Sequence, residues 1–381
     1  MISLTNIIKG EGGAQHQLSL AEYFMNNGHE VKLIAPRRQV DEEAPEIFRN
    51  VGTWSMSLCR FGLPGSLDSI LQIPLLIWYR LTGNYKVLYT RAVALTVLVN
   101  LVARLLFMKV IVEHNGWLAT ERRERTGNNF LARIESTLQI FSAQTAHMNR
   151  TVTKGLRRLL EEGGVSNKKI TVIGNGTDIS RFYPMNRKQV LNELEWDVSI
   201  TRIGFIGGIV PWQGLETAVK ALANLNDLKN VRLVIAGDGP DLPRIRRLAD
   251  ELGVSTIIDF LGYISRQKAN LIINSFDIAI APFTQQRNME IGLSAIKIRD
   301  YAAAGRVVIC SDIPELLEAE ATDWIRFYQP DDVNELSQKL MEVMSDGSDK
   351  SKNQIAAREY AENYFDWNIM ASRVLACISD L

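Results

Sequence analysis

The chain has few of the residues on which disulfide-stapled folds and metal centres depend. Its 381 residues include only three cysteines and four histidines. The cysteines, Cys59, Cys310 and Cys377, are far apart and form no CxxC pair, so a disulfide framework is excluded and a reducing cytosol is favoured. The histidines are also separated, and no HExxH motif is present. We therefore expect no protein-bound metal and no cofactor.

The chain also lacks an excess of charge and a long hydrophobic run. Lys plus Arg and Asp plus Glu both number 43, so no global field marks a nucleic-acid binder. The N-terminus has no basic region followed by an apolar run, which predicts no signal peptide. The most apolar stretch, Ala92 to Met108, contains Asn100 and Arg104 and is too short to span a bilayer. It predicts a buried crossover helix in a cytoplasmic protein.

What the chain does have is strands alternating with helices in two successive arrays. The first array begins with a strand at Ile2–Thr5, a glycine turn at Gly12 and Gly13, a helix and the strand EVKLIAP. A second array begins at RIGFIGGIV, and a chain of this length favours two domains. The pattern predicts an α/β fold of two doubly wound Rossmann-like domains facing a central cleft. We expect the domains at residues 1–185 and 186–365, with a C-terminal helix at about 366–381 packing back on the first.

The stretch from Pro282 to Ser311 carries most of the candidate chemistry. It predicts a loop, then a helix with Ser294 as a plausible N-cap, then the buried strand VVIC. Lys297 and Asp300 are three residues apart and share a helix face, so one site could present a cation and a carboxylate. Free backbone N–H groups at the helix start suit a phosphate. The alternative is a surface ion pair on an ordinary crossover helix.

Six segments, in order and with fitting gaps, resemble the family 4 glycosyltransferases. They are GEGGAQHQLSLAEYFMNNGHEVKLI, IGNGTDISRFYP, GFIGGIVPWQGLETAVKAL, LVIAGDGP, FLGYI and KIRDYAAAGRVVI. The resemblance implies the two-domain GT-B fold and transfer of sugar from a nucleotide-diphosphate donor with retention of configuration. It also implies a glycan or lipid-linked acceptor, in synthesis of a bacterial surface polysaccharide or glycolipid. The absence of Asp-x-Asp disfavours the other large transferase fold and its divalent metal.

The resemblance also implies a set of donor-binding residues, and the chain departs from the family within it. Where the family commonly has Arg and Lys around the glycine turn that opens the second domain, here Gly207 and Gly208, this chain has Ile209 and Gln213. A dianionic leaving group requires donors and positive charge, so we expect substitutes from Lys297, Arg287 and the helix start, helped by the Gln213 amide. The donor-binding residues expected are Gly12, Gly13, Gly207, Gly208, Gln213, Gly237, Gly262, Tyr263, Arg287, Gly292, Leu293, Ser294, Lys297 and Asp300.

The family's paired glutamates fall on the same stretch. The second aligns with Asp300, whose carboxylate would accept hydrogen bonds from the ribose hydroxyls. The first falls on Gly292, and Glu290 could supply the missing carboxylate only if the loop bends to suit. Another reading is a family variant in which backbone N–H groups around IGLSAIK hold the sugar.

The family also places a histidine at the end of a first-domain strand, here VEHNGW. His114 is one candidate catalytic group and Asn115 the other, because consecutive strand residues point to opposite faces and only one can face a cleft. The alternative for His114 is a satisfied buried histidine. Acceptor contacts are expected from His16, Trp117 and Arg122.

The basic clusters ERRER and KGLRRLL suggest peripheral membrane contact through an anionic or lipid-linked acceptor, or simply a charged surface. Three rivals to a transferase remain. One is a GT-B protein that binds nucleotide or glycan without turnover, and the second is a nucleotide-sugar epimerase. The third, a nicotinamide dehydrogenase, is disfavoured because no GxGxxG is followed by an acidic residue about 20 positions later.

Overall fold

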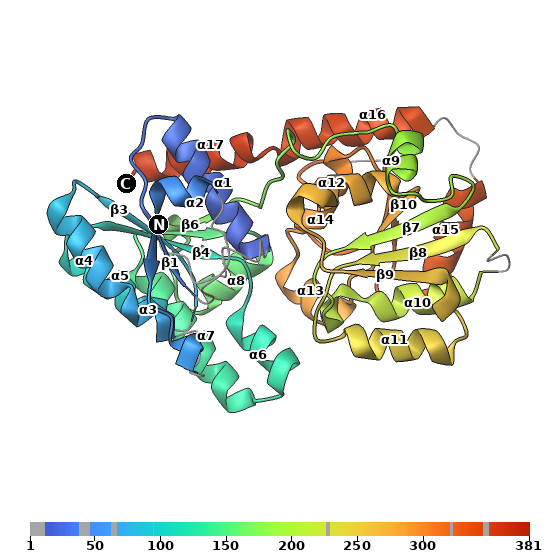
Figure 1. The fold of residues 1–381 in the computed structure, drawn as a ribbon. Coiled ribbons are helices and arrows are strands. Elements are labelled where there is room, and N and C mark those ends of the chain that lie inside the picture. Colours follow the sequence, from blue (N-terminus) through green and yellow to red (C-terminus); the bar gives the residue numbers. More distant parts are fainter. Residues whose placement is uncertain are drawn as a thin grey trace. The chain divides into compact units, whose positions relative to one another are not determined.

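A computed structural model describes residues 12–37, 46–61, 67–93, 95–225, 229–320, 323–345 and 350–381. The expected first strand, Ile2–Thr5, lies outside this range. The chain divides into two compact units, which Figure 1 shows in the colours of the sequence. Unit 1 comprises Met1–Asn175 and Trp367–Leu381, and unit 2 comprises Gly176–Asp366. Each is an α/β unit with parallel strands, as the sequence predicts.

Unit 1 contains parallel strands covered by helices. Its strands are β1 (Leu33–Pro36), β2 (Gly52–Ser55), β3 (Val87–Arg91), β4 (Lys109–His114), β5 (Met148–Thr151) and β6 (Ile170–Val172). Its helices are α1 (Gly12–Asn26), α2 (Glu46–Val51), α3 (Asp68–Leu71), α4 (Ile73–Thr82), α5 (Thr96–Leu105), α6 (Leu118–Thr126), α7 (Asn129–Thr145), α8 (Lys154–Glu162) and α17 (Trp367–Ser379). The described pairings give one sheet β1-β2 and another in the order β3-β4-β5-β6.

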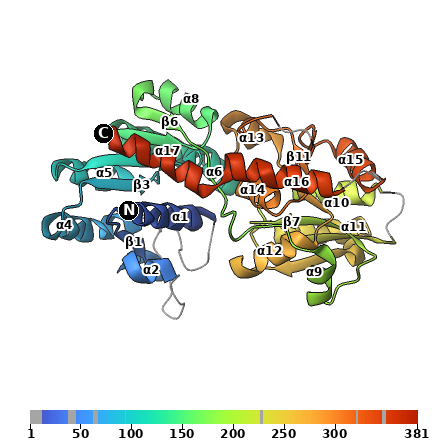
Figure 2. The same ribbon diagram turned by 90° about the horizontal axis from the view of Figure 1, so that it is seen from above.

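Side chains of β4 alternate between the two faces of this sheet and contribute to the apolar core on each face. Ile111 belongs to the cluster formed with α1 and α17, whereas Val110 and Val112 belong to the cluster formed with α4 and α5. Side chains of successive strand residues point to opposite faces, which explains the split. Figure 2 shows α17 alongside α1, and the two helices are in contact.

Unit 2 has a single six-stranded sheet with all pairs parallel. Its strands are β7 (Thr201–Ile206), β8 (Val231–Ala236), β9 (Ile258–Gly262), β10 (Ile278–Ala281), β11 (Val308–Ser311) and β12 (Ile325–Tyr328), in the order β12-β11-β10-β7-β8-β9. Its helices are α9 (Arg187–Glu193), α10 (Leu215–Ala223), α11 (Leu242–Glu251), α12 (Arg266–Ser275), α13 (Gln285–Ile291), α14 (Ile296–Ala303), α15 (Val333–Ser345) and α16 (Lys350–Tyr360).

The helices of unit 2 cover both faces of its sheet. Residues of α12, α14 and α16 form one apolar cluster, and residues of α10, α11 and α15 form the other. Figure 1 shows α12 and α14 on one side of the strands and α10 and α11 on the other. Along β8, Val234 joins the first cluster and Leu233 and Ile235 join the second. Both faces are buried, as a doubly wound parallel sheet requires.

The boundary between the units differs from the expected one. We expected the first domain to reach 185, but it ends at Asn175. The following segment packs on unit 2, because Phe182 is buried in the α12–α14 cluster. The Tyr183 amide also donates to Asn270 Oδ1 at 3.3 Å, and the Met185 amide donates to Asn274 Oδ1 at 2.8 Å. Proline and phenylalanine in RFYP therefore mark attachment to the second unit rather than the end of the first.

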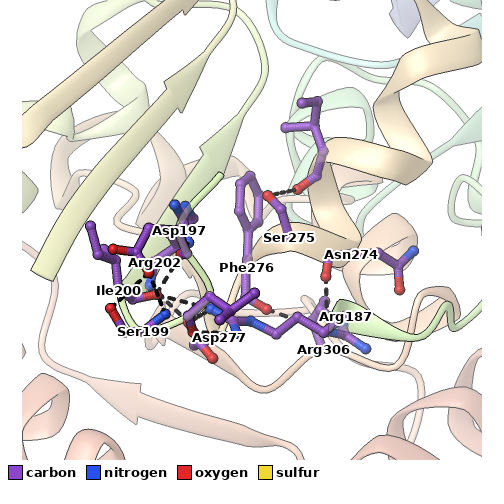
Figure 3. Close-up of polar contacts among 12 residues, drawn as sticks. Arg187, Asp197, Ser199, Ile200, Arg202, Asn274, Ser275, Phe276, Asp277 and Arg306 are labelled. Atoms are coloured by element: carbon purple, nitrogen blue, oxygen red, sulfur yellow. Dashed lines mark hydrogen bonds and ion pairs between the residues drawn. The ribbon is translucent and has the colours of Figure 1, made fainter. Parts of the chain in front are cut away.

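A cluster of polar contacts fixes the amino ends of β7 and β10 (Figure 3). Asp277 Oδ2 accepts from Arg187 Nη2 at 2.6 Å and from the Arg202 backbone amide at 2.8 Å. Arg306 donates to the Phe276 carbonyl at 3.3 Å, and its burial lowers its pKa to about 10. These groups lie at the amino ends of the strands, opposite the carboxyl edge. They therefore stabilise the sheet and do not contact a ligand bound at the carboxyl edge.

The stretch after β10 also differs from expectation. Residues expected to form a loop form helix α13. The Asn288 amide nitrogen stabilises it by donating to the carbonyls of Thr284 at 2.9 Å and of Trp212 at 3.1 Å. Ser294 is not the N-cap of the next helix, because α14 has Ala295 at that position and no side-chain cap. A stabilising contact with a segment far away in the sequence is invisible to local propensity.

The contact of α17 with unit 1 gives a stability prediction. Met370 is fully buried in the α1–α17 cluster, so Met370→Ala leaves a cavity and should lower the free energy of unfolding by about 2–5 kcal/mol. Urea denaturation followed by circular dichroism measures this. Ser372→Ala, at an exposed position on the same helix, should change stability by less than about 0.5 kcal/mol. Equal effects of the two substitutions would contradict the packing.

Candidate functional site

The strand order of unit 2 reverses between β7 and β10. The chain leaves β7 for β8 and β9 on one side and later returns to form β10 on the other. Ligands of open α/β sheets bind outside the carboxyl ends of the strands at such a point. The glycine turn after β7 and the segment Pro282–Phe283 after β10 both lie at this edge. It is therefore the candidate binding site.

Glycines at this edge allow backbone segments to approach closely. Gly207 and Gly237 have φ of +141° and +144°, a region that side chains disfavour. A Cβ on Gly237 would lie 1.9 Å from the Gly207 carbonyl oxygen, and one on Gly214 would lie 1.6 Å from the Pro282 oxygen. These three positions therefore require glycine. Gly208 differs, since a Cβ there would meet nothing within 4 Å.

Lys297, the second residue of α14, extends over the turn after β7. Its Nζ donates to Gln213 Oε1 at 2.5 Å. The same nitrogen lies 3.5 Å from the ring centroid of Phe205 and 5.5 Å from that of Phe283. A Cβ on Gly207 would be 3.2 Å from it. Lys297 and Gln213, which we expected to contact the donor diphosphate, are therefore hydrogen-bonded to each other at this edge.

Burial of the ammonium group lowers the pKa of Lys297 well below its ordinary value. The two rings contribute cation–π attraction but cannot replace the hydration of the ammonium ion. Within the described residues its hydrogen-bond acceptor is a neutral amide rather than a carboxylate. An anion placed beside Lys297 would restore the charged form, so the geometry favours an anionic ligand at this edge.

Asp300 lies one turn further along α14 and is buried. It accepts a hydrogen bond from Thr177 Oγ1 at 2.5 Å. Burial raises the pKa of Asp300 to about 6, and the nearby Arg266 guanidinium opposes the shift. Arg266 lies over the Phe182 ring at 5.4 Å. Sequence reasoning missed Thr177 and Arg266, although Thr177 lies in the quoted motif IGNGTD.

Helix α13 carries two of the expected site residues, Arg287 and Glu290. Arg287 is buried, with its guanidinium 5.0 Å from the Trp212 ring centroid and a contact of 3.4 Å to Asn288 Oδ1. Glu290 is exposed on the same helix. Glu290 could have taken the place of the family's first glutamate only if a loop bent there. The segment is helical instead, so the structure does not support the expected catalytic position of Glu290.

The other expected donor residues fall around this edge. Gly292 ends α13 with φ +67°, Leu293 is partly buried, and Ser294 is buried ahead of α14. Gly262 ends β9 with φ +68°, and its carbonyl accepts from the Gly237 amide at 2.7 Å. Tyr263, which follows it, is 63% exposed. A large exposed ring beside the carboxyl end of β9 is available to stack on a planar ligand.

In unit 1, His114 is a core residue. Its side chain is fully buried, with Nε2 3.0 Å from Asn149 Oδ1 and Nδ1 3.2 Å from Gln139 Nε2. Burial lowers its pKa to about 4, so the ring is neutral at pH 7. Both nitrogens are occupied, which corrects the expectation that His114 is a catalytic group; the alternative of a satisfied buried histidine holds.

Glu113 and Asn115 point to the other face and meet each other. Asn115 Nδ2 donates to Glu113 Oε1, and Glu113 Oε2 forms a fully buried ion pair with Arg150 at 2.8 Å. The Tyr89 hydroxyl also donates to Glu113 at 2.5 Å. Arg150 donates further to the Gly174 carbonyl at 2.7 Å. This network holds Asn115 at the carboxyl edge of unit 1, so Asn115 is the better candidate of the pair.

The sequence contains part of the signal for this network. Glu113 and Arg150 are charged residues in strands of otherwise buried character, KVIVEH and MNRT. Opposite charges on neighbouring buried strands predict a pair. The pairing of β4 with β5, which sets Glu113 opposite Arg150, was the missing information.

Two expected acceptor residues are engaged within the fold. Trp117 is 7% exposed and precedes α6 as its N-cap. Arg122 forms a bidentate ion pair with Glu135, with Nε 3.1 Å from each carboxylate oxygen. A role of either residue in acceptor binding stays a prediction. Gly12 and Gly13 begin α1, and the side chain of His16 lies outside the described part.

The described residues contain neither a clustered metal site nor a membrane-spanning helix. No group of three or more His, Cys, Asp or Glu side chains in this part of the chain is arranged to hold a metal ion. Among the described helices, none combines the length and apolar character needed to cross a bilayer.

Comparison with known proteins adds family information. Residues 10–181 match the family model described as Glycosyltransferase Family 4, and residues 200–346 match the model described as Glycosyl transferases group 1. An uncharacterised glycosyltransferase of Methanocaldococcus jannaschii is 27% identical over 208 residues, covering 53% of this chain and 52% of that protein. A putative colanic acid biosynthesis glycosyltransferase of Escherichia coli is 25% identical over 224 residues, covering 58% and 53%. The chain thus spans about half the length of the curated relatives it matches.

Solved structures support the fold. The crystal structure of HepE from Anabaena in complex with UDP and glucose superposes with a TM-score of 0.78 at 15% identity, covering 100% of this chain and 98% of that one. At this identity the likeness concerns the fold alone. It confirms the expected GT-B class, built from two Rossmann-like units.

The buried ion pair gives a second prediction. Glu113→Gln leaves the Arg150 guanidinium buried without its counter-charge, so the free energy of unfolding should fall by about 3–5 kcal/mol. Adding Arg150→Met should recover most of that loss, because the double variant buries no unpaired charge. Urea titration measures both. As a control, Arg157→Gln breaks an exposed pair with Glu161 and should cost less than about 1 kcal/mol. A double variant no more stable than Glu113→Gln would contradict this account.

Proposed function

Because the chain belongs to the family 4 glycosyltransferases, we propose that it transfers a sugar from a nucleotide-diphosphate sugar to a glycan or lipid-linked acceptor, with retention of configuration and without a metal ion. The observation that carries this proposal is the Lys297 ammonium group, held by Gln213 over the glycine turn at the switch point of unit 2. It lies where a diphosphate would approach, and it replaces positive charge that the chain lacks at Ile209 and Gln213.

The proposed reaction needs few protein groups. The bond from the anomeric carbon to the diphosphate oxygen breaks, and a bond to the acceptor hydroxyl oxygen forms on the same face. The acceptor proton moves to the leaving phosphate, which acts as the base. Lys297 stabilises the charge that develops on the diphosphate, an effect that grows as the bond breaks. Asp300 accepts hydrogen bonds from the ribose, and the exposed Tyr263 ring borders the base.

Two relatives guide the choice of substrates. HepE of Anabaena was solved with UDP and glucose, so uridine nucleotides are the first donors to test. The Escherichia coli relative is named for colanic acid biosynthesis, which favours an acceptor from bacterial surface polysaccharide synthesis. The rival function, binding without turnover, is favoured by one observation: Ile209 is fully buried and cannot be a phosphate ligand.

A panel experiment tests the function. Thermal shifts with uridine, guanosine, adenosine and thymidine diphosphates and their sugar conjugates identify the donor, since a ligand that binds the folded state raises the melting temperature. Release of free nucleoside diphosphate in the presence of glycan acceptors then identifies a transferase. An epimerase would keep the diphosphate linked to the sugar, and a binding protein would raise the melting temperature without release.

Removing the ammonium group gives the third prediction. Lys297→Met should weaken nucleotide-sugar binding at least about tenfold, because a hydrogen bond to a charged group contributes about 1.5–3 kcal/mol. Isothermal titration calorimetry measures it. Lys220→Met removes an exposed lysine of the same unit that pairs with Glu216, and it should leave the affinity unchanged. Equal affinity of Lys297→Met and the unaltered protein would contradict the role of Lys297.

The raised pKa of Asp300 gives a fourth prediction. With a pKa of about 6, the carboxylate that accepts from ribose is largely protonated at pH 5. Affinity for a nucleotide sugar, which has no phosphate group titrating in this range, should therefore fall about tenfold from pH 7.5 to pH 5. Asp300→Asn should bind weakly and show a flatter pH profile. A profile unchanged by this substitution would rule out Asp300 as the titrating group.

The same shift has the opposite sign for folding without ligand. The folded-state pKa of Asp300 lies above the unfolded value of about 3.9, so protonation favours the folded state. The stabilising contribution is fully present below pH 4 and is lost as pH rises through about 6. Melting temperatures with and without nucleotide sugar separate the two effects.

A further inference from the structure

Three helices of unit 1 expose apolar side chains on the side that faces away from the sheet. The residues concerned are Trp78 and Leu81 on α4, Leu98, Leu101 and Leu105 on α5, Phe107 just after α5, and Phe130, Ile134 and Phe141 on α7. We call this surface the α4–α5–α7 face. The most exposed are Phe107 at 92%, Leu105 at 78%, Leu81 at 74% and Phe130 at 72%. A crossover helix was expected to be buried, but α5 is apolar on both sides and only one side is covered.

Helical spacing shows that these side chains lie on one face. Leu98, Leu101 and Leu105 are three and four residues apart, so they form a single stripe along α5. The opposite side of α5 carries Val99 and Ala103, which are buried against the sheet. The stripe therefore faces solvent along the length of the helix.

Helix α7 repeats the arrangement. Phe130, Ile134 and Phe141 are exposed at helical spacing, whereas Ala132 and Ala143 on the other side are fully buried. Both helices thus present an apolar stripe outwards.

Polar contacts join the three helices into one layer. Arg80 Nε on α4 donates to the Leu106 carbonyl at 3.1 Å. Asn100 Nδ2 on α5 donates to Ser142 Oγ on α7 at 2.9 Å, and Arg104 donates to the Thr145 carbonyl at 3.1 Å. Figure 1 shows α4, α5 and α7 along the same side of unit 1. The exposed stripes are therefore neighbours and form one continuous surface.

Phe107 is the most unusual residue of this face. It has φ of +56°, a left-handed conformation that glycine and asparagine adopt far more readily than phenylalanine. Its side chain is 92% exposed and therefore makes few packing contacts. Neither the backbone conformation nor the packing of the folded chain explains an aromatic side chain here.

The charges on this face are of one sign. Helices α4, α5 and α7 contain a single carboxylate, Glu135, and this group is bound by Arg122. Exposed basic residues lie on or beside these helices: Arg104 on α5, Arg133 on α7, and Lys109 two residues after Phe107. The face combines apolar, aromatic and cationic groups without an unpaired acid.

We propose that the α4–α5–α7 face docks on the surface of an anionic lipid bilayer. Phosphate headgroups complement its arginines and lysine, and the boundary with the acyl chains accommodates its leucine and aromatic side chains. A second copy of the chain fits less well, because a symmetric contact would set Arg104 and Arg133 against like charges with no carboxylate between them.

This surface differs from the basic clusters that suggested membrane contact in the sequence. Arg122 of ERRER is bound by Glu135, and in α8 Arg157 and Arg158 pair with Glu161 and Glu162. These pairs engage one arginine of the first cluster and both arginines of the second. The inference goes beyond the proposed transfer reaction, since lipid binding does not require turnover.

Vesicle sedimentation of the full chain tests the inference and is the fifth prediction. The protein should pellet with vesicles of phosphatidylcholine and phosphatidylglycerol in equal parts, and much less with phosphatidylcholine alone. Leu105→Glu combined with Phe107→Asn should lower the partition coefficient at least about tenfold. Lys109→Gln with Arg133→Gln should lower it by about tenfold on the anionic vesicles.

Two controls separate docking from misfolding. Ile355→Glu changes a residue of α16 that is 58% exposed and should leave vesicle binding unchanged. Phe107→Gly suits the left-handed backbone, so it should keep or raise the melting temperature while it weakens vesicle binding.

The inference is overturned if the unaltered protein stays in the supernatant with anionic vesicles, or if Leu105→Glu with Phe107→Asn pellets as the unaltered protein does. Analytical ultracentrifugation completes the test. A dimer that is lost in this variant, together with no vesicle binding, would assign the face to a second copy of the chain instead.

Discussion

The close approach of Lys297 to the turn after β7 is the constraint on which the candidate site depends. The lysine side chain lies over a glycine that cannot carry a side chain, between two aromatic rings, with an amide oxygen as its hydrogen-bond acceptor. These three neighbours are neutral, so protonation of the buried Lys297 amino group is costly until an anion binds. The glycines at Gly214 and Gly237 serve the same geometry, because they bring the neighbouring turns within contact of the strand ends. The fold thus places the Lys297 amino group beside the turn at which Ile209 and Gln213 carry no positive charge.

The sequence predicted this part well because its signals are local. Glycines before helices, strong helix formers in α14 and short apolar runs fix the order of strands and helices. The loss of cations around the turn at Gly207 and Gly208 led to the expectation that Lys297, helped by the Gln213 amide, serves the donor site, but their hydrogen bond to each other was not anticipated. What could not be anticipated is the helix α13, which depends on an Asn288 contact with Trp212, a residue 76 positions earlier. The domain boundary was misplaced for a related reason, since Phe182 packs into a cluster of distant residues.

The choice between His114 and Asn115 shows another limit of sequence reasoning. Alternation along a strand tells that the two side chains point to opposite faces, but not which face carries the chemistry. The contacts decide: His114 is enclosed by Gln139 and Asn149, whereas Asn115 joins the Glu113–Arg150 network at the strand end. Apolar composition has the same limit for α5. The sequence of α5 is apolar on both sides and therefore predicts a buried helix, although one side of α5 faces solvent.

The central claim is that one lysine, placed on α14, performs the work of the absent cations. Exchanging the two partners tests it most directly, with calorimetric titration of the nucleotide sugar that gives the largest thermal shift. Lys297→Gln alone should lose affinity, and Lys297→Gln combined with Gln213→Lys should regain most of it, because the ammonium group returns to the same site from the facing turn. Unchanged affinity in Lys297→Gln would contradict the claim. Lost affinity in both variants would show that charge alone, without the position of Lys297, is not sufficient.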